Sequence, residues 1–97
     1  MATYIRHATR AVKLKISLDT ARSRAIIAEE LSALSVLAKG TGTYTLVFVF
    51  GDGTELELGN TEIADGDRFD WDISELRMTH TAQAGVSATF IGEQQVL

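Results

Sequence analysis

The chain has 97 residues, no cysteine, no proline and a formal net charge of −4. Its length fits a single domain, and the absence of cysteine excludes disulfides and thiolate metal sites, so an apolar core must stabilise the fold. A composition of 45% hydrophobic and 23% charged residues argues against intrinsic disorder. No apolar run reaches the roughly 18 residues of a membrane span, so no membrane partner is expected. Residues 1–9 lack the apolar stretch of a secretory signal, and we expect synthesis in the cytosol.

The first regular element is predicted over residues 12–18, where apolar side chains alternate with lysine and serine. Alternation with a period of two is typical of a strand with one buried and one exposed face. The residues before it, 1–10, are expected to form an extended N-terminal arm. The β-sandwich domain is assigned to residues 11–92, and a polar C-terminal tail to residues 93–97.

Residues 20–37 can be interpreted in two ways. They are rich in the helix formers Ala, Glu, Arg and Leu, and their apolar residues recur at three- and four-residue spacing. Serine and valine weaken a helix, however, and the apolar residues near the end of the segment also alternate. We therefore favour a strand at 24–28, a tight turn at 29–32 and a strand at 33–39, and a helix stays as the alternative.

The strongest strand signal is the segment 43–50 (TYTLVFVF), which is β-branched or aromatic almost throughout. Because both of its faces are apolar, it is predicted to be a central strand covered on both sides. The Gly-Asp-Gly sequence at 51–53 supplies a tight hairpin turn, and residues 54–58 are predicted to return as the next strand.

Further strands are predicted at 69–73, 76–80 and 86–91, where apolar and polar residues again alternate. About eight short strands at roughly ten-residue spacing indicate an all-β protein. The predicted fold is an antiparallel β-sandwich, jelly-roll or Greek-key like, with the extended N-terminal arm preceding it; a small barrel is the related possibility.

Charge is unevenly distributed along the chain. Residues 1–24 hold six basic residues against a single aspartate, a balance of +5, whereas residues 25–97 hold three basic and twelve acidic residues, a balance of −9. The net charge of −4 therefore conceals a basic leading segment and an acidic body. Because an acidic surface repels phosphate, no nucleic-acid partner is expected.

The basic leading segment could be paired in two ways. Lys13 and Lys15 could face acidic strands of the same sheet, where each opposite-charge pair contributes roughly 0.2–1 kcal/mol, and we favour this for these two residues. Arg6 and Arg10 precede the regular strand, and for them we favour contact with a different, acidic chain or with a neighbouring copy.

The densest group of possible metal ligands comprises Asp65, Asp67, Asp70 and Asp72. Ca²⁺ takes six to eight oxygen ligands, which carboxylates at alternate positions of a loop can supply. The twelve-residue calcium loop with its terminal glutamate is absent, however, and Asp and Gly are equally typical of turns. We favour a turn followed by a solvated strand face, and we expect no shift in thermal stability with EDTA or calcium.

No residue pattern indicates an enzyme. His7 and His80 are far apart and no cysteine joins them, so no metal site is predicted, and His80 is expected to pack at a strand end. Ser74, His80 and an acid would supply the groups of a catalytic triad, but the nucleophile elbow is absent. Trp71 and Tyr44 could form a stacking platform for a sugar, although their alternation with core positions favours burial. We therefore predict no catalytic residue and no cofactor.

Three stretches of the chain, LDTARS at 18–23, GTGTYTL at 40–46 and ISELRMTHTAQAG at 73–85, together resemble small virion proteins of tailed bacteriophages. The last stretch is similar to a strand followed by T-x-T-A-Q-x-G and a further strand. The resemblance covers roughly residues 12–91, and its motifs mark turns and strand registers, so it transfers no catalytic residue. It implies that residues 81–85 form the last connection of the domain.

That group includes capsid decoration proteins and tail or fibre modules, which are typically all-β sandwiches. The resemblance implies a non-enzymatic structural protein of the virion, with a capsid decoration (cement) protein as the leading hypothesis. Its partners would be the major capsid protein or another virion protein, and its own copies in a homo-oligomer, with a trimer favoured. Tyr4, Ile5, Arg6 and Arg10 of the arm would dock on the shell or on an adjacent copy. The alternatives are a tail, fibre or receptor-binding component and, outside viruses, a carbohydrate-binding β-sandwich module.

Overall fold

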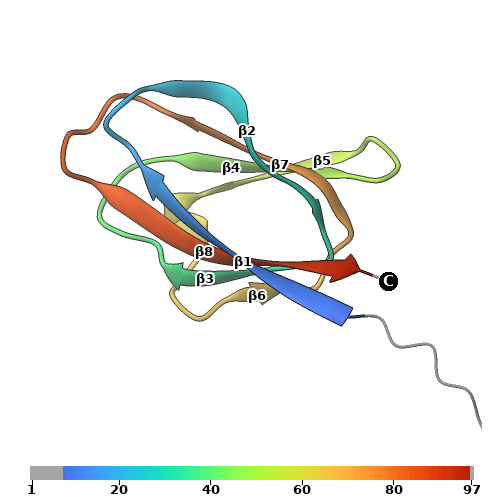
Figure 1. Cartoon of the computed structure of the whole chain (residues 1–97). Coiled ribbons are helices and arrows are strands. Elements are labelled where there is room, and N and C mark those ends of the chain that lie inside the picture. Colours follow the sequence, from blue (N-terminus) through green and yellow to red (C-terminus); the bar gives the residue numbers. More distant parts are fainter. Residues whose placement is uncertain (1–7, 97) are drawn as a thin grey trace, which may run out of the picture.

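The computed structural model describes residues 8–96, which form eight β-strands and one short 3-10 helix (Figure 1). The strands are β1 (Ala8–Ser17), β2 (Arg22–Leu31), β3 (Ala33–Ala38), β4 (Thr45–Phe50), β5 (Glu55–Gly59), β6 (Arg68–Phe69), β7 (Ile73–His80) and β8 (Ser87–Val96). The 3-10 helix, η1 (Asn60–Glu62), follows β5. Within residues 8–96, no helix is long and apolar enough to cross a membrane.

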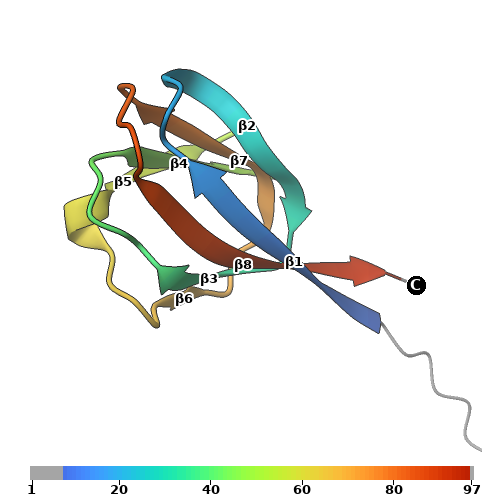
Figure 2. The ribbon, with the colours of Figure 1, turned by 60° about the vertical axis from the view of Figure 1, so that its left-hand side comes forward.

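The strands form two antiparallel sheets, with the orders β1-β8-β3-β6 and β2-β7-β4-β5. The first strand pairs with the last, β2 with β7, β3 with β6, and β4 with β5, so the chain is one long antiparallel ribbon folded over on itself. Pairing of β3 with β8 and of β4 with β7 joins the folded halves into sheets, which face each other in Figures 1 and 2. This topology is a jelly roll. The predicted all-β antiparallel sandwich is therefore confirmed.

The hydrophobic core lies between the two sheets, and β4 contributes to it as predicted. Leu46 and Phe48 of β4 are fully buried and pack in one cluster with Phe90 of β8, from the opposite sheet. Burying each such side chain contributes about 1.5–3 kcal/mol. On the outer face of β4, Val47 is only 1% exposed, and Arg77 lies directly opposite it on β7. Both faces of β4 are covered, which is why its sequence is apolar from Leu46 to Phe50.

Residues 20–37 form two strands, so the helical alternative is wrong, and a turn confined to 29–32 is also wrong. β2 continues through this turn region to Leu31, and Ser32 alone separates it from β3. At this point the chain passes from one sheet to the other, and Glu30 bends it with a positive φ of 55°. The abrupt crossing lets Leu31 and Ala33 on either side of Ser32 both be buried.

The strand predicted at 69–73 is shorter than the alternation indicates. β6 comprises only Arg68 and Phe69, residues 70–72 lie outside any strand, and β7 then runs without interruption from Ile73 to His80. The chain crosses here from the β1-β8-β3-β6 sheet to the other sheet. Alternating apolar residues persist through the crossing because both sides of it contact the same core, and the period of two therefore overestimates the length of β6.

Strand pairing extends past the limits of the predicted domain, 11–92. β1 and β8 pair in an unbroken register from Ala8 opposite Val96 to Ser17 opposite Ser87. β8 also pairs with β3, but only as far as Glu93. Residues 8–10 and 94–96 therefore form a two-stranded ribbon that projects from the sandwich (Figures 1 and 2).

The two lysines of β1 do not face acidic residues of their own sheet, so that interpretation is wrong. Lys13 lies opposite Ile91 and Lys15 opposite Thr89 on β8. Among residues 8–96, the ion pairs that form involve Arg24, Arg68 and Arg77 as the basic partners. The positive charge of β1 is thus left facing outward.

Candidate functional site

The arm residues proposed to contact a partner fall into two groups. Tyr4, Ile5 and Arg6 lie outside the described residues. Arg10 belongs to β1, where it is exposed and lies opposite Gln94 of β8. The projecting ribbon therefore carries one of the four predicted contact residues, and residues 1–7 are joined to it at Ala8.

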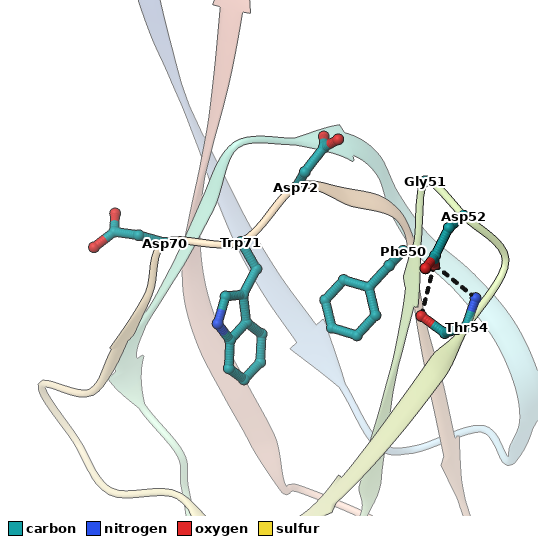
Figure 3. Close-up of a pocket in the computed structure, with 7 residues that line it drawn as sticks. All are labelled: Phe50, Gly51, Asp52, Thr54, Asp70, Trp71 and Asp72. Atoms are coloured by element: carbon teal, nitrogen blue, oxygen red, sulfur yellow. Dashed lines mark hydrogen bonds between the residues drawn. The ribbon is translucent and has the colours of Figure 1, made fainter.

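A hollow of about 630 Å³ lies between the β4–β5 turn and the loop that joins β6 to β7 (Figure 3). We call it the Trp71 hollow. Its lining residues are Phe50, Gly51, Asp52, Thr54, Asp70, Trp71 and Asp72. Trp71 is half-buried, and its ring lies edge-on to Phe48 at 5.3 Å and to Phe50 at 5.7 Å between centroids. It also tilts against Phe69 at 4.8 Å. These contacts give Trp71 a fixed position at the edge of the core, as aromatic contacts of this geometry do.

The carboxylates of the Trp71 hollow do not converge on one point. Asp52 accepts hydrogen bonds from the Thr54 hydroxyl (2.6 Å) and N–H (3.0 Å), which hold its pKa below the ordinary value. Asp70 accepts from Arg68 Nε at 2.9 Å. In Figure 3 the side chains of Asp70 and Asp72 point to different sides of Trp71. The hollow therefore offers an aromatic surface with separate hydrogen-bond acceptors around it, an arrangement suited to neutral polar groups such as hydroxyls.

The aspartates at 65 and 67, weighed as calcium ligands, accept hydrogen bonds from backbone N–H groups. Asp65 Oδ1 accepts from the backbone N–H of Lys39 at 2.8 Å, and Asp67 Oδ2 accepts from the N–H of Ala64 at 2.8 Å. Among residues 8–96, no three His, Asp or Glu side chains are grouped so that they could hold a metal ion. The insensitivity of thermal stability to EDTA and calcium stays a prediction.

His80 is 6% exposed at the end of β7, where the sequence placed it. Its Nε2 lies 2.9 Å from Arg22 Nη1, and its Nδ1 lies 2.6 Å from the carbonyl oxygen of Thr81. Because a guanidinium group can only donate, Nε2 accepts from Arg22 and Nδ1–H donates to Thr81 O in this arrangement. Within the described residues these are its hydrogen-bond partners, and Ser74 is not one of them. The contacts are those of a structural histidine.

Tyr44 and Trp71 do not form a common stacking platform. Tyr44 is 2% exposed, its hydroxyl donates to the carbonyl oxygen of Lys39 at 2.8 Å, and its ring lies edge-on to Phe90. Burial, with a smaller contribution from Asp65, raises its pKa to about 12. Trp71 lines the Trp71 hollow, whereas the Tyr44 side chain is buried in the core.

The three stretches singled out in the sequence, at 18–23, 40–46 and 73–85, meet at one end of the sandwich. The Gln83 side chain bonds to both backbone groups of Thr43. Its Oε1 accepts from Thr43 N–H (2.9 Å) and its Nε2 donates to the Thr43 carbonyl oxygen (2.7 Å), so the amide bonds to Thr43 as the backbone of a neighbouring strand would. The N–H of Gln83 donates to Leu18 O at 2.7 Å, and Asp19 Oδ1 accepts from the N–H of Gly85 at 2.8 Å. These residues hold loops together, and period-based sequence analysis could not pair them because they are distant in the chain.

The class that the topology defines is a jelly-roll β-sandwich with a Trp-lined hollow and a projecting basic ribbon. No family model matches the chain, and no curated protein and no solved structure is significantly similar to it. What the chain does is therefore proposed from the geometry described above and from the three stretches singled out in its sequence.

Proposed function

We propose that the chain is a non-enzymatic structural protein of a tailed-phage virion, and specifically a head decoration (cement) protein that binds the major capsid protein and its own copies. The observation that carries the proposal is the jelly roll in which the projecting β1–β8 ribbon leads directly to residues 1–7. Jelly rolls are widely used in viral capsids, but the fold is shared by unrelated functions. Support therefore also comes from the ribbon and from the resemblance over residues 12–91.

The projecting ribbon is suited to docking for energetic reasons. Beyond Glu93, β8 has β1 as its only strand partner among residues 8–96. A two-stranded ribbon on its own is marginally stable in water. This ribbon is tied to the sandwich by the Gln94 side chain, which donates to Glu29 O of β2 at 2.9 Å, and contact with a neighbouring surface would stabilise it further. Arg10 is exposed on this ribbon and supplies a positive charge for an acidic partner.

Decoration also fits the small size of the domain. A 97-residue sandwich offers only modest contact area per copy, but a lattice presents many equivalent sites. When each copy binds both the lattice and its neighbours, the second contact becomes intramolecular and overall avidity rises by roughly 10²–10⁴ without any new contact. Many weakly bound copies can therefore reinforce a shell.

The proposal is tested with a variant that lacks residues 2–7. This truncation leaves every pair of the β1–β8 ribbon in place, so we expect thermal unfolding close to that of the full chain but loss of binding to heads. The full chain is the control, and a second truncation lacking residues 2–10, which removes part of β1, shows what ribbon damage does to stability. Full binding by the first truncation would remove the docking role of residues 2–7.

Composition of purified virions tests the function itself. We expect the coding gene to lie among capsid, portal or tail genes, and the chain to be present in the encoded particles at many copies. A few copies per particle on a stained gel would indicate a tail, fibre or receptor-binding component instead. Absence of the chain from those virions would overturn the proposal.

Carbohydrate binding is a second candidate, favoured by one observation: the Trp71 hollow combines an aromatic ring with separate carboxylate acceptors. In this case addition of a cognate glycan should change Trp71 fluorescence, and Trp71→Ala should abolish binding while Asp65→Asn, outside the hollow, should not. Blue-shifted emission that is protected from a soluble quencher would exclude stacking on Trp71.

A further inference from the structure

Each sheet ends in a regular strand with a free edge. β1 ends one sheet and β5 ends the other, and among residues 8–96 neither strand has a neighbour on its outer side. β1 pairs with β8, and β5 with β4, without any register shift. Edges without bulges or prolines are templates for pairing with another chain.

The backbone groups on the β1 edge belong to its lysines. The N–H of Leu18 donates to Val86 O at 2.9 Å, in the register that pairs β1 with β8. Residues opposite each other in an antiparallel pair alternate between bonded and non-bonded, so the even-numbered residues of β1 bond to β8. The N–H and C=O groups of Lys13 and Lys15 therefore point to the free edge.

The backbone groups on the β5 edge belong to its glutamates. The N–H of Phe50 donates to Thr54 O, and the N–H of Asn60 donates to Tyr44 O, both at 2.9 Å. Both bonds continue the β4–β5 register, so even-numbered residues of β5 bond to β4. Glu55 and Glu57 consequently present free N–H and C=O groups.

On both edge strands, the residues with free backbone groups are also the residues whose side chains lie on the outer face. On β1, Leu14 packs against the core while the lysines on either side of it are exposed. On β5, Leu58 packs against the core, Leu56 is 39% exposed on the same side, and Glu55 and Glu57 are exposed on the other. In both strands the charged residues carry the free backbone groups and lie on the outer face of the sandwich.

We propose that β1 of one copy pairs antiparallel with β5 of the next copy, which makes a continuous sheet across the contact. In one register, Lys13 faces Glu57 of the next copy, Lys15 faces Glu55, and Leu14 covers the exposed Leu56. Antiparallel pairing is required for this arrangement. In an antiparallel pair, two residues that exchange N–H···O=C bonds lie directly opposite each other with their side chains on the same face of the sheet. The lysines of β1 and the glutamates of β5 therefore bond through their free backbone groups and stay on the same outer face. The inference rests on the proposed function, since it specifies how copies of a decoration protein contact one another.

Charge selects this contact over the symmetric one. Pairing β1 with β1 would bring lysine against lysine in many registers, which is unfavourable, whereas lysine against glutamate is favourable. A contact between two different edges is heterologous and closes into a ring when the rotation allows it. A closed trimer is the ring that we expect.

The ion pairs that already engage the β5 glutamates leave room for a second cation. Arg24 contacts Glu55 at 2.8 Å and Glu57 at 3.6 Å, and the two carboxylate side chains are 43% and 61% exposed. A carboxylate has about four lone-pair sites, and exposed ion pairs of this kind contribute only about 0–1 kcal/mol. A lysine from the next copy can therefore bind without displacing Arg24.

The natural absence of cysteine allows a direct test by disulfide trapping. Lys13→Cys and Glu57→Cys variants are prepared separately, mixed and oxidised mildly. Directly opposite bonded residues have Cα atoms about 5.5 Å apart, within disulfide range. We expect the mixture to form linked heterodimers in several-fold higher yield than Lys13→Cys mixed with Glu29→Cys, which lies on the edge of β2. Equal yields, or efficient linking of Lys13→Cys with itself, would overturn the inference.

Charge reversal gives an independent measurement that does not depend on cysteine chemistry. Glu55→Lys/Glu57→Lys should lose the oligomer in sedimentation velocity at low salt, and so should Lys13→Glu/Lys15→Glu, while an equimolar mixture of the two variants should associate again. Thermal unfolding of each variant checks that it is folded. If the mixed variants did not form the oligomer again, the proposed pairing would be contradicted.

These outcomes separate the inference from the proposed function. If virions contain the chain but trapping shows no β1–β5 contact, the inference fails and the decoration role stands. If trapping succeeds but virions lack the chain, the contact stands and the decoration role fails.

Discussion

Tyr44 links burial, hydrogen bonding and pH in a single side chain. Its ring is almost fully buried, and its hydroxyl donates to Lys39 O. Ionisation would place a phenolate in an apolar environment near Asp65, so burial first and that charge second raise the pKa from 10.0 to about 12. The folded state therefore holds this proton more tightly than the unfolded chain does.

This difference predicts how stability depends on pH. The contribution of neutral Tyr44 is fully present below the unfolded pKa of 10.0 and is lost as the pH rises towards about 12, with a total loss on the order of 2–3 kcal/mol. Tyr44→Phe should cost about 1 kcal/mol at pH 8 through the lost hydrogen bond, and its stability should then fall less between pH 10 and 12. Urea unfolding at several pH values measures both. If the free energy of unfolding fell equally with pH in the Tyr44→Phe variant and in the unmodified protein, the prediction would be contradicted.

At the scale of an element, the crossing from β2 to β3 is a bend made by a residue that is not glycine. Glu30 has a φ of 55°, a left-handed conformation that costs an L-residue about 1–2 kcal/mol. Ser32 anchors the crossing, because its N–H and hydroxyl both donate to Glu93 O, at 2.7 and 3.2 Å. The burial of Leu31 and Ala33, on either side of Ser32, compensates for the backbone strain at Glu30.

Replacing Glu30 by glycine and by alanine isolates this strain. Both variants remove the same exposed side chain, but only glycine adopts a positive φ freely. We expect Glu30→Gly to be more stable than Glu30→Ala by about 1 kcal/mol, the reverse of the usual order in a strand. Chemical denaturation measures the difference, and a more stable alanine variant would show that the bend is relaxed.

For the whole molecule, the jelly roll demands that distant parts of the chain meet. β1 pairs with β8 and β2 with β7, so most of the sheet can form only after large loops have closed. Such non-local pairing slows folding to milliseconds or seconds. At the same time the chain contains no proline, so the isomerisation step that delays many proteins has no source in it.

We therefore predict that the chain refolds on a scale of about milliseconds to seconds and lacks the tens-of-seconds phase that proline isomerisation produces. The single tryptophan, Trp71, packs on Phe48 and reports core formation. Stopped-flow fluorescence at several protein concentrations measures this, and dilution distinguishes folding from assembly. A slow phase that is independent of concentration would contradict the prediction.

Local patterns predicted much of the fold but little of the candidate site. The alternation around Phe48 indicated a central strand, and the alternation around His80 indicated a packed histidine, because a period of two depends only on neighbouring residues. The Trp71 hollow was not predicted, because it needs the β4–β5 turn beside the β6–β7 loop. The contact of Gln83 with Thr43 was missed for the same reason.

By itself, the sequence determined the class of structure: a cysteine-free, all-β domain with a core centred on β4, since strand periodicity and turn residues are encoded locally. Only the tertiary structure decided between helix and strand for residues 20–37, whose apolar residues fit both periods. It also decided which strands are edges, because an edge is defined by partners distant in the chain. The basic charge of β1 is visible in the sequence, but its place on a free edge follows from the packing of two sheets around one core.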